Sequence, residues 1–117
     1  MINIIAFVGP SGSGKTTLRN QLGMEKIITY TSRAPREGEV DGVHYHFSTR
    51  DEILRMHEEG ELLEYTQYHG YFYATSIRAI SRVIDMNATA SIIVDRNGAK
   101  KLKDRYGDKV LVIGITA

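Results

Sequence analysis

Residues 9–16 read Gly-Pro-Ser-Gly-Ser-Gly-Lys-Thr, a complete G-x-x-x-x-G-K-[ST] phosphate-binding loop. An apolar run, residues 4–8, comes directly before the loop, and a run that can form a helix, residues 17–22, comes directly after it. Such loops need this order of strand, loop and helix, so the context favours a phosphate site over a flexible Gly/Ser turn. The stretch therefore predicts a P-loop that binds a nucleoside triphosphate.

The residue types in this loop fit that chemistry. Glycines let consecutive backbone N–H groups turn toward a polyphosphate, and the positive end of the following helix adds to their field. Lys15 can reach the β- and γ-phosphates, and the Thr16 hydroxyl can hold Mg²⁺. The predicted contacts to the triphosphate are Gly9, Ser11, Gly12, Ser13, Gly14, Lys15, Thr16 and Thr17.

The composition is that of an ordinary globular domain. The chain has 117 residues, 42% hydrophobic and 25% charged, which suits a single domain with a real core. The net charge of +1 gives no argument for nucleic-acid or membrane partners, and the lack of cysteine excludes disulfides and thiolate metal sites. With no signal peptide or long apolar segment in the sequence, we expect a cytoplasmic protein. The sequence does not fix its oligomeric state.

The rest of the chain alternates between strand and helix patterns. Apolar, β-branched runs predict buried strands at residues 3–8, 27–31, 90–95 and 110–115. Helical periodicity predicts further helices at residues 51–59, 76–86 and 97–106. A Thr49/Glu52 capping box starts the first of these helices, Gly60 ends it, and Gly107 ends the last. This alternation indicates an α/β fold with a parallel sheet flanked by helices.

Two segments interrupt that pattern. Between Gly42 and Tyr73 the sequence becomes aromatic-rich, with a turn at His69-Gly70, which predicts a small β-containing insertion. Before it, Arg33 and Arg36 lie three residues apart, at the end of a predicted strand. Guanidinium groups match phosphate oxygens bidentately, so the pair predicts either a second phosphate site or two ordinary surface arginines.

The order of motifs after the P-loop resembles the guanylate kinase family. The motifs are Thr31-Ser-Arg-x-Pro-Arg-x-Gly-Glu-x-x-Gly42, Tyr45-x-Phe47, Glu61-Leu-Leu-Glu64-Tyr and Gly70-Tyr-Phe-Tyr73-Ala-Thr75. Order and spacing hold along the chain, apart from a shorter connection before Ile27. The resemblance implies one P-loop domain with a core at residues 1–32 and 75–117 and a mixed β, GMP-binding subdomain at about 33–74. It also implies Mg²⁺-assisted transfer of a phosphoryl group from ATP to GMP or dGMP.

The resemblance assigns roles by position. Arg33, Arg36, Tyr45 and Tyr73 would hold the GMP phosphate; Glu64, Thr75 and Asp95 would read the guanine; and Thr29 stands where the family usually has a serine. Carboxylates can accept from the guanine N1–H and N2–H₂ groups, and a hydroxyl such as that of Thr75 can donate to O6. The attacking phosphate is already ionised, so positioning and charge stabilisation suffice, and Lys15, Arg33 and Arg36 are the predicted catalytic residues.

The sequence departs from the family pattern in three places. The strand before Asp95 usually carries a second acid, associated with magnesium, where this chain has Ile93, so Thr16 and Asp95 would share the metal. Ala74 replaces a usual glycine, a mild change unless φ is positive. The sequence stops at Ala117, before the family's lid, adenine-binding segment and last strand, as expected of either a fragment or a minimal homologue.

Other interpretations remain at this stage. A catalytically silent guanylate kinase-like module that binds a nucleotide or phosphopeptide is the rival to an enzyme: Ile93 favours it and the intact P-loop disfavours it. His44 and His46 would share one face of a strand and could form a metal pair, although no third ligand is evident. The tyrosines between 65 and 73 are better explained by packing than by stacking on nucleic acid, because the chain has no basic excess.

Overall fold

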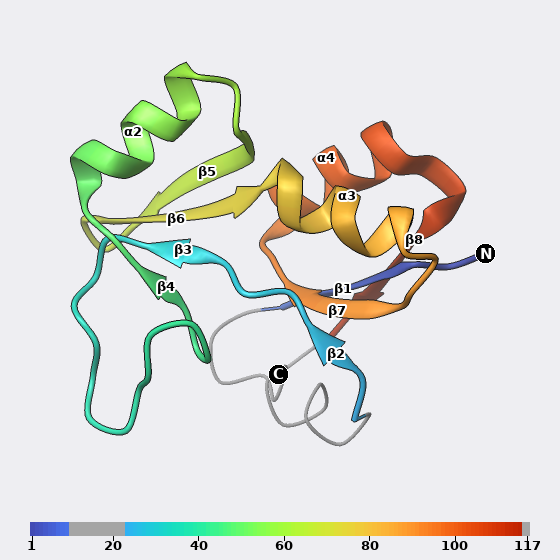
Figure 1. The fold of residues 1–117 in the computed structure, drawn as a ribbon, viewed down its shortest axis with the longest axis horizontal. Coiled ribbons are helices and arrows are strands. Elements are labelled where there is room, and N and C mark those ends of the chain that lie inside the picture. Colours follow the sequence, from blue (N-terminus) through green and yellow to red (C-terminus); the bar gives the residue numbers. More distant parts are fainter. Residues whose placement is uncertain (10–22, 116–117) are drawn as a thin grey trace. The chain divides into compact units, whose positions relative to one another are not determined.

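The computed structural model describes residues 1–9 and 23–115, and the chain divides into two compact units (Figure 1). The parallel unit comprises Met1–Ile27 with Ile80–Ala117, and the mixed unit comprises Ile28–Ala79. The predicted boundaries were a core at 1–32 and 75–117 and an insertion at about 33–74. The helix predicted at residues 17–22 lies outside the described residues.

Within residues 1–9 and 23–115, the parallel unit contains a four-stranded sheet in the order β2-β7-β1-β8. Its strands are β1 (Ile4–Val8), β2 (Glu25–Lys26), β7 (Ala90–Ile93) and β8 (Val110–Gly114), and each neighbouring pair is parallel. Ile4 lies opposite both Ala90 and Val110, and all three are fully buried. The predicted α/β class with a parallel sheet is therefore confirmed.

Among the residues that the structure describes, two helices belong wholly or partly to this unit. Helix α4 (Arg96–Tyr106) packs against β1 and β8, and it buries Ala99 and Leu102. It ends at Gly107, whose φ of +56° favours glycine, and a 3₁₀ turn, η1 (Gly107–Lys109), leads into β8. Helix α3 (Ile77–Asp85) spans the boundary between the units and buries Ile80.

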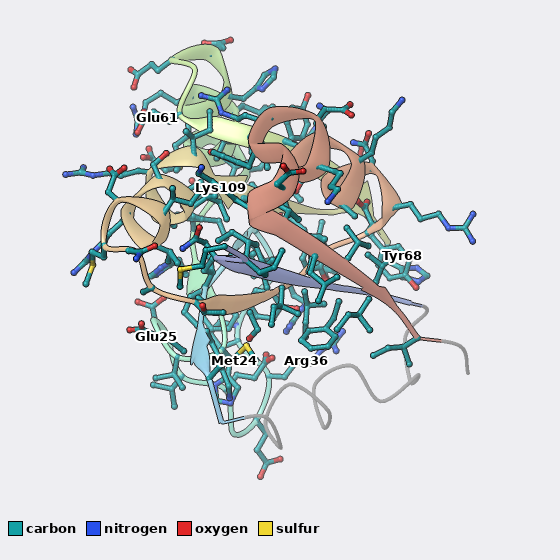
Figure 2. The ribbon with its side chains drawn as sticks, turned by 90° about the vertical axis from the view of Figure 1, so that its right-hand side faces the viewer. Met24, Glu25, Arg36, Glu61, Tyr68 and Lys109 are labelled. Atoms are coloured by element: carbon teal, nitrogen blue, oxygen red, sulfur yellow. The ribbon has the colours of Figure 1, made fainter. Side chains whose placement is uncertain are left out.

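Backbone hydrogen bonds tie the amino ends of these strands together. The Asn3 N–H donates to the carbonyl of Lys109 over 2.9 Å, and Lys109 is labelled in Figure 2. The Asn3 carbonyl in turn accepts from the Ala90 N–H over 2.9 Å. Strand β8 is the last in the order among the described residues, and Leu111 and Val112 on it are 44% and 40% exposed.

The mixed unit contains a second four-stranded sheet in the order β4-β3-β6-β5. Its strands are β3 (Tyr30–Thr31), β4 (His46–Phe47), β5 (Leu62–Tyr68) and β6 (Tyr71–Ser76). Strands β5 and β6 form an antiparallel hairpin whose turn residues, His69 and Gly70, both have positive φ, +51° and +82°. Two consecutive positive φ values are typical of the tight turn that matches the twist of a hairpin.

Helix α2 (Arg50–Glu58) covers one face of this sheet and creates its core. The Thr49 hydroxyl accepts from the Glu52 N–H over 3.1 Å, so the predicted cap is present. The buried residues shared by the helix and the sheet are Ile53, Met56, Leu62, Phe72 and Ala74. One face of the sheet is therefore committed to packing.

The opposite face of the hairpin carries a different set of side chains. Side chains alternate between the two faces of a strand, and cross-strand partners share a face. The partners that face away from Phe72 and Ala74 are Glu64 with Thr75, Thr66 with Tyr73 and Tyr68 with Tyr71. A register shift between Leu62 and Glu64 lets Leu62 face the core and Glu64 the other side.

The strand predicted at residues 27–31 is wrong as a single element. Its beginning belongs to the parallel sheet, where β2 pairs with β7 and the Ile27 N–H donates to the Ser91 carbonyl over 2.8 Å. Its end, Tyr30–Thr31, pairs with β4 and β6 in the other sheet. An apolar run hides such a change of sheet, because Ile27 and Thr31 are both buried. The strands β1, β7 and β8 and the helices α2, α3 and α4 lie within two residues of their predicted bounds.

No helix in the described ranges combines the length and the apolar character that crossing a bilayer requires.

Candidate functional site

Thr31 fixes where the arginine-bearing loop leaves the mixed sheet. Its side chain is fully buried, and its hydroxyl donates to the Phe72 carbonyl on β6 over 3.0 Å. The same hydroxyl accepts from the Arg33 N–H over 3.2 Å. One residue on, the Ser32 hydroxyl accepts from the Phe72 N–H over 2.8 Å. The backbone of Arg33 is thereby attached to the sheet.

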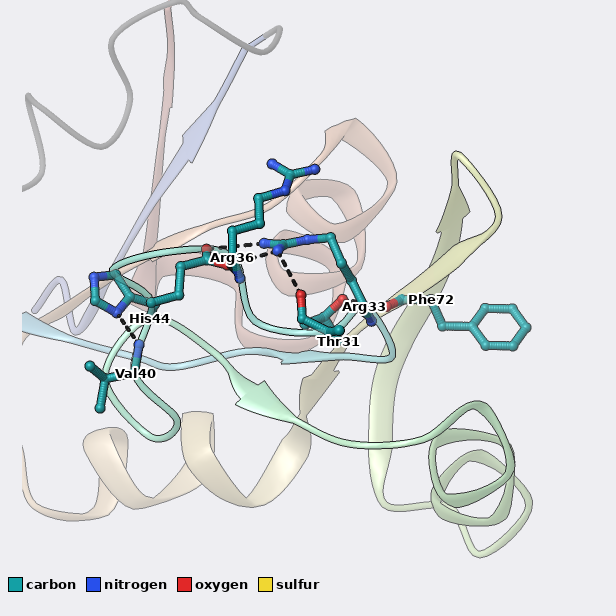
Figure 3. A network of polar contacts seen from close by, with 8 residues as sticks. Thr31, Arg33, Arg36, Val40, His44 and Phe72 are labelled. Atoms are coloured by element: carbon teal, nitrogen blue, oxygen red, sulfur yellow. Dashed lines mark hydrogen bonds and ion pairs between the residues drawn. The ribbon is translucent and has the colours of Figure 1, made fainter.

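The Arg33 guanidinium is buried and forms a two-pronged ion pair with Glu39. Arg33 is 6% exposed, its Nη1 lies 2.7 Å from Glu39 Oε1, and its Nη2 lies 3.1 Å from Glu39 Oε2. Nη1 also donates to the Ala34 carbonyl over 3.1 Å. Figure 3 shows the guanidinium held within the loop by these contacts. Buried guanidinium groups need partners of this kind because desolvation of an unpaired charge is costly.

The pairing perturbs both ionisable groups. Hydrogen bonding from Arg33, helped by the backbone N–H of Arg36, lowers the pKa of the Glu39 carboxyl from 4.5 to about 2, and burial opposes the shift. Hydrogen bonding to Glu39 raises the pKa of Arg33 above its ordinary value; burial opposes this, and the Tyr73 hydroxyl adds to it. Both groups are therefore ionised at neutral pH.

Glu39 also organises Arg36 through the backbone. Its Oε1 accepts from the Arg36 N–H over 2.7 Å, and its own N–H donates to the Arg36 carbonyl over 2.9 Å. Gly38, with a φ of +83°, allows the tight turn between them. The Arg36 guanidinium is exposed, makes no hydrogen bond or ion pair with the described residues, and extends away from the loop (Figure 3).

Tyr45 and Tyr73 lie beside the arginine loop. The Arg33 guanidinium carbon is 5.4 Å from the centre of the Tyr45 ring, and the Tyr45 and Tyr73 rings are 6.0 Å apart in an edge-on arrangement. The Tyr45 carbonyl accepts from the Gly42 N–H over 2.8 Å, which holds this tyrosine in place. Arg33, Tyr45 and Tyr73, predicted to bind one phosphate, are therefore brought together.

Glu64 and Thr75 form a buried polar pair on the face of the hairpin opposite α2. They are 7% and 2% exposed, and the Thr75 hydroxyl donates to Glu64 Oε1 over 2.8 Å. Thr75 was predicted to donate to a guanine O6. In this arrangement the hydroxyl proton is given to Glu64, so Thr75 orients the Glu64 carboxylate, and its contact with O6 stays a prediction.

Thr29 lies between β2 and β3, where the chain passes from one sheet to the other. Its carbonyl accepts from the His46 N–H over 2.9 Å, and it is half-buried. Within the described residues its hydroxyl makes no hydrogen bond, so the structure gives Thr29 a backbone role and does not test the predicted contact to GMP. Ala74, another position that departs from the family pattern, lies buried in β6 without a positive φ, so alanine causes no strain there.

The predicted triphosphate site begins at the carboxyl edge of the parallel sheet. Gly9 directly follows β1 and Asp95 follows β7, and these strands are neighbours with Phe7 opposite Ile93. The Val94 N–H donates to the Phe7 carbonyl over 3.1 Å and extends this pairing. Ligands of open parallel sheets bind at this edge. The rest of the predicted loop, Ser11, Gly12, Ser13, Gly14, Lys15, Thr16 and Thr17, lies outside the described residues.

Asp95 is exposed and acts as the N-cap of α4. Its Oδ1 accepts from the Gly98 N–H over 2.8 Å. Asp95 belongs to the parallel unit, whereas the other predicted GMP contacts belong to the mixed unit. The cap orients the carboxylate at the edge of the sheet. Ile93, at the position where the family usually has an acid, is half-buried at the end of β7.

The structure does not place His44 and His46 on one face of a strand, as the alternation in the sequence predicted. His46 lies in β4, with its ring 4.7 Å from that of Tyr30, but His44 lies in the preceding turn. The Nδ1 of His44 accepts from the Val40 N–H over 3.0 Å (Figure 3). Across residues 1–9 and 23–115, His, Asp and Glu side chains form no group of three that could bind a metal ion.

Sequence reasoning missed Thr31 and Glu39, the two residues that fix the arginine loop. A signal for Glu39 was present, because Arg36-Glu-Gly-Glu39 has the glycine and spacing of a tight turn, which brings the last residue back to the first. Its pairing with Arg33, six residues away, could not be read from spacing, because it depends on the path of the loop.

Comparison with known proteins identifies the family to which nearly the whole chain belongs. Residues 1–115 match the family described as guanylate kinase. The chain belongs to the guanylate kinase family. This confirms the resemblance drawn from the motifs after the P-loop.

Individual relatives give the extent of the match. The chain is 37% identical over 115 residues to a guanylate kinase of Enterococcus faecalis, covering 93% of this chain and 56% of the relative. It is 39% identical over 113 residues to one of Paraburkholderia xenovorans, covering 92% and 50%. A solved guanylate kinase from Anaplasma phagocytophilum superposes with a TM-score of 0.81 at 29% identity, covering 98% of this chain and 60% of that one. The chain thus spans about half the length of the curated relatives it matches.

Proposed function

We propose that this protein transfers the γ-phosphoryl group of ATP to the phosphate of GMP, and also of dGMP. The bond between the γ-phosphorus and its bridging oxygen breaks, a bond from that phosphorus to a GMP phosphate oxygen forms, and ADP and GDP leave. The attacking oxygen is already deprotonated, so no side chain needs to remove a proton. Membership of the guanylate kinase family supports this proposal.

The observation that carries the proposal is the arginine loop of the mixed unit. A buried, fully ionised Arg33, the Arg36 side chain exposed beside it, and two tyrosines provide donors and positive charge for one phosphate group. Surface arginines without such a role need not be buried or locked by a carboxylate. In the same unit, the Glu64 carboxylate held by Thr75 would accept from the N1–H and N2–H₂ of guanine.

Adenine would be rejected for a physical reason. Adenine offers an acceptor at N1 and has no amine at C2. The buried Glu64 carboxylate, itself an acceptor, could therefore form no hydrogen bond with it. A site built on hydrogen bonds discriminates strongly against a partner that cannot make them. We therefore expect turnover with GMP and dGMP and little with AMP.

The parallel unit would bind ATP and Mg²⁺. Mg²⁺ takes most of its ligands from substrate phosphates and water and needs one or two protein oxygens. Asp95 fits this need, because it offers one exposed carboxylate at the carboxyl edge of the sheet. Asp95 and the Thr16 hydroxyl would hold the ion, which neutralises phosphate charge when it is bound. Lys15 would bind the β- and γ-phosphates.

A coupled assay of ADP release tests the proposal. ATP and Mg²⁺ are held constant while GMP, dGMP or AMP is varied, and GDP is identified directly by chromatography. We expect ADP release that depends on GMP and matches GDP formation. If ATP and GMP both bind but no GDP forms, the assignment as a kinase is wrong.

A second candidate is a nucleotide- or phosphopeptide-binding module with little or no activity. The observation that favours it is Ile93, an apolar residue where the family usually carries an acid linked to magnesium. This candidate predicts binding of GMP or of a phosphorylated peptide without Mg²⁺-dependent ATP binding. Titration calorimetry with GMP, a phosphoserine peptide and Mg·ATP separates the two candidates.

A further inference from the structure

The Arg33 guanidinium uses its Nη1/Nη2 edge on Glu39, whereas its Nε has no hydrogen-bond partner among the described residues. Arginine has five N–H donors arranged as a planar fork. Glu39 takes one hydrogen each from Nη1 and Nη2, and the Ala34 carbonyl takes the second hydrogen of Nη1. The remaining donors are the Nε–H and the second hydrogen of Nη2.

These two remaining donors lie on the same edge of the guanidinium plane. A pair of parallel N–H groups on one edge is the arrangement that binds two oxygens of a phosphate or carboxylate. The Nε atom is buried and has no hydrogen-bond partner among the described residues. Buried polar atoms are nearly always satisfied, so an unpartnered donor at this position points to a ligand.

We propose that Glu39 is a positioning residue for the phosphate acceptor. The Glu39 carboxylate binds the Nη1/Nη2 edge of Arg33, so that the Nε/Nη2 edge faces the phosphate. It also accepts a hydrogen bond from the backbone N–H of Arg36 and so fixes that residue. The inference rests on the proposed function, since it assigns the unused edge to the GMP phosphate. Glu39 itself does not touch the substrate.

The same contacts give Arg33 and Arg36 different roles. Because the Glu39 carboxylate balances the charge of Arg33, the pair contributes directed hydrogen bonds more than net charge. Arg36, exposed and free of ion pairs within the described residues, supplies the uncompensated positive charge. Glu39 thus makes two chemically identical side chains act differently.

The test compares Glu39→Gln with Glu37→Gln. Both variants remove one negative charge from the same loop, but Glu37 is exposed and makes no hydrogen bond or ion pair with the described residues. Glutamine at 39 can accept from the Arg36 N–H, but its amide group meets Nη2 donor to donor. Direct binding of GMP is measured by titration calorimetry, and KM and kcat are measured for both substrates.

We expect Glu39→Gln to raise the Kd and KM for GMP about tenfold, with the KM for ATP unchanged, and Glu37→Gln to leave all values within about twofold. Equal effects on the two substrates, or a GMP affinity like that of wild type, would overturn the proposal. If Glu39→Gln fails to unfold cooperatively, Glu39→Asp replaces it. Aspartate keeps the charge but cannot reach both nitrogens, so a rise of about threefold is expected and no rise overturns the proposal.

The binding measurement separates this proposal from the proposed function. A wild-type protein that binds GMP but forms no GDP contradicts the kinase assignment and still permits the Glu39 test by affinity alone. If the wild-type protein binds neither GMP nor inorganic phosphate, the arginine loop has no phosphate ligand and both proposals are overturned.

Discussion

The two units present their polar groups in opposite ways. In the mixed unit, the predicted ligand-binding groups lie on strands or on a loop tied to a strand, and the important side chains are buried and hydrogen-bonded to each other. In the parallel unit, the central strands β1 and β7 are largely buried, and the predicted groups come after these strands, at the carboxyl edge of the sheet. A sheet with one open face can carry chemistry on that face, whereas a covered parallel sheet carries it at its edge.

This contrast separates two kinds of effect. Side chains in the mixed unit depend on partners within the protein, so changing one of them alters both the site and the local packing. Groups at the edge of the parallel sheet depend on loop backbone and on the ligand itself. The four predictions that follow test this separation, from the largest expected effect to the smallest.

Lys15→Ala should reduce kcat about 1,000-fold and weaken Mg·ATP binding, because it removes the charge assigned to the β- and γ-phosphates. The affinity for GMP should stay within about twofold, since the acceptor residues belong to the other unit. Kinetics and separate calorimetric titrations of the two nucleotides measure this. Lys100→Ala, on the exposed side of α4, is the matched control. A large loss of GMP affinity in Lys15→Ala would break the comparison.

Arg33→Lys and Arg36→Lys should differ, although both keep the positive charge. A lysine ammonium lacks the two edges with which a guanidinium can bind Glu39 and a phosphate at the same time. Arg33→Lys should therefore raise the KM for GMP about 100-fold. Arg36→Lys keeps an exposed cation and should raise it less than about tenfold. Steady-state kinetics over a range of GMP concentrations distinguishes them. Equal losses at the two positions would show that the Arg33–Glu39 pair gives Arg33 no special role.

Thr75→Val should raise the KM for GMP about tenfold, because the isosteric side chain cannot hold the Glu64 carboxylate. Thr75→Ser keeps the hydroxyl and should stay within about threefold. The effect should fall on KM for GMP and leave KM for ATP unchanged. A loss in the serine variant as large as that in the valine variant would mean that the methyl group matters and the hydrogen bond does not.

The smallest effect concerns stability at low pH. The pKa of Glu39 falls from 4.5 to about 2 on folding, so its contribution to the free energy of unfolding is complete above pH 4.5 and is lost as the pH falls toward 2. We expect a contribution on the order of 1 kcal/mol, because the carboxylate is partly exposed and therefore screened.

Urea unfolding of wild type and Glu39→Gln between pH 2 and 7 measures that contribution. The difference in unfolding free energy between them should be constant at neutral pH and shrink through the acid range. A difference that does not change with pH would show that the ion pair contributes no charge-dependent stability.

Much of the fold could be predicted because local chemistry decides it. The Thr49 cap, the glycines at 60 and 107 and the His69-Gly70 turn mark their boundaries through single residues whose backbone needs are known. The apolar runs of β1, β7 and β8 are typical of covered parallel strands. These signals lie within a few residues of the features they determine.

The rest depends on contacts between distant residues. Residues 27–31 look like one strand, and only the partners on β7 and β6 show that the run changes sheet. The hydrogen bond from the Thr75 hydroxyl to Glu64 joins two strands, and no local pattern in the sequence predicts it. The Glu39 carboxylate has no periodic pattern, and its role appears only when the loop brings it to Arg33.

The exposed strand β8 has a practical consequence for anyone producing this protein. Among the described residues it is the last strand on one side of its sheet, and its Leu111 and Val112 side chains are exposed, which are features of an edge that can pair with the edge of another chain. We expect concentrated samples to associate through this edge. Val112→Lys should reduce this association, because a charged side chain on an edge strand opposes pairing.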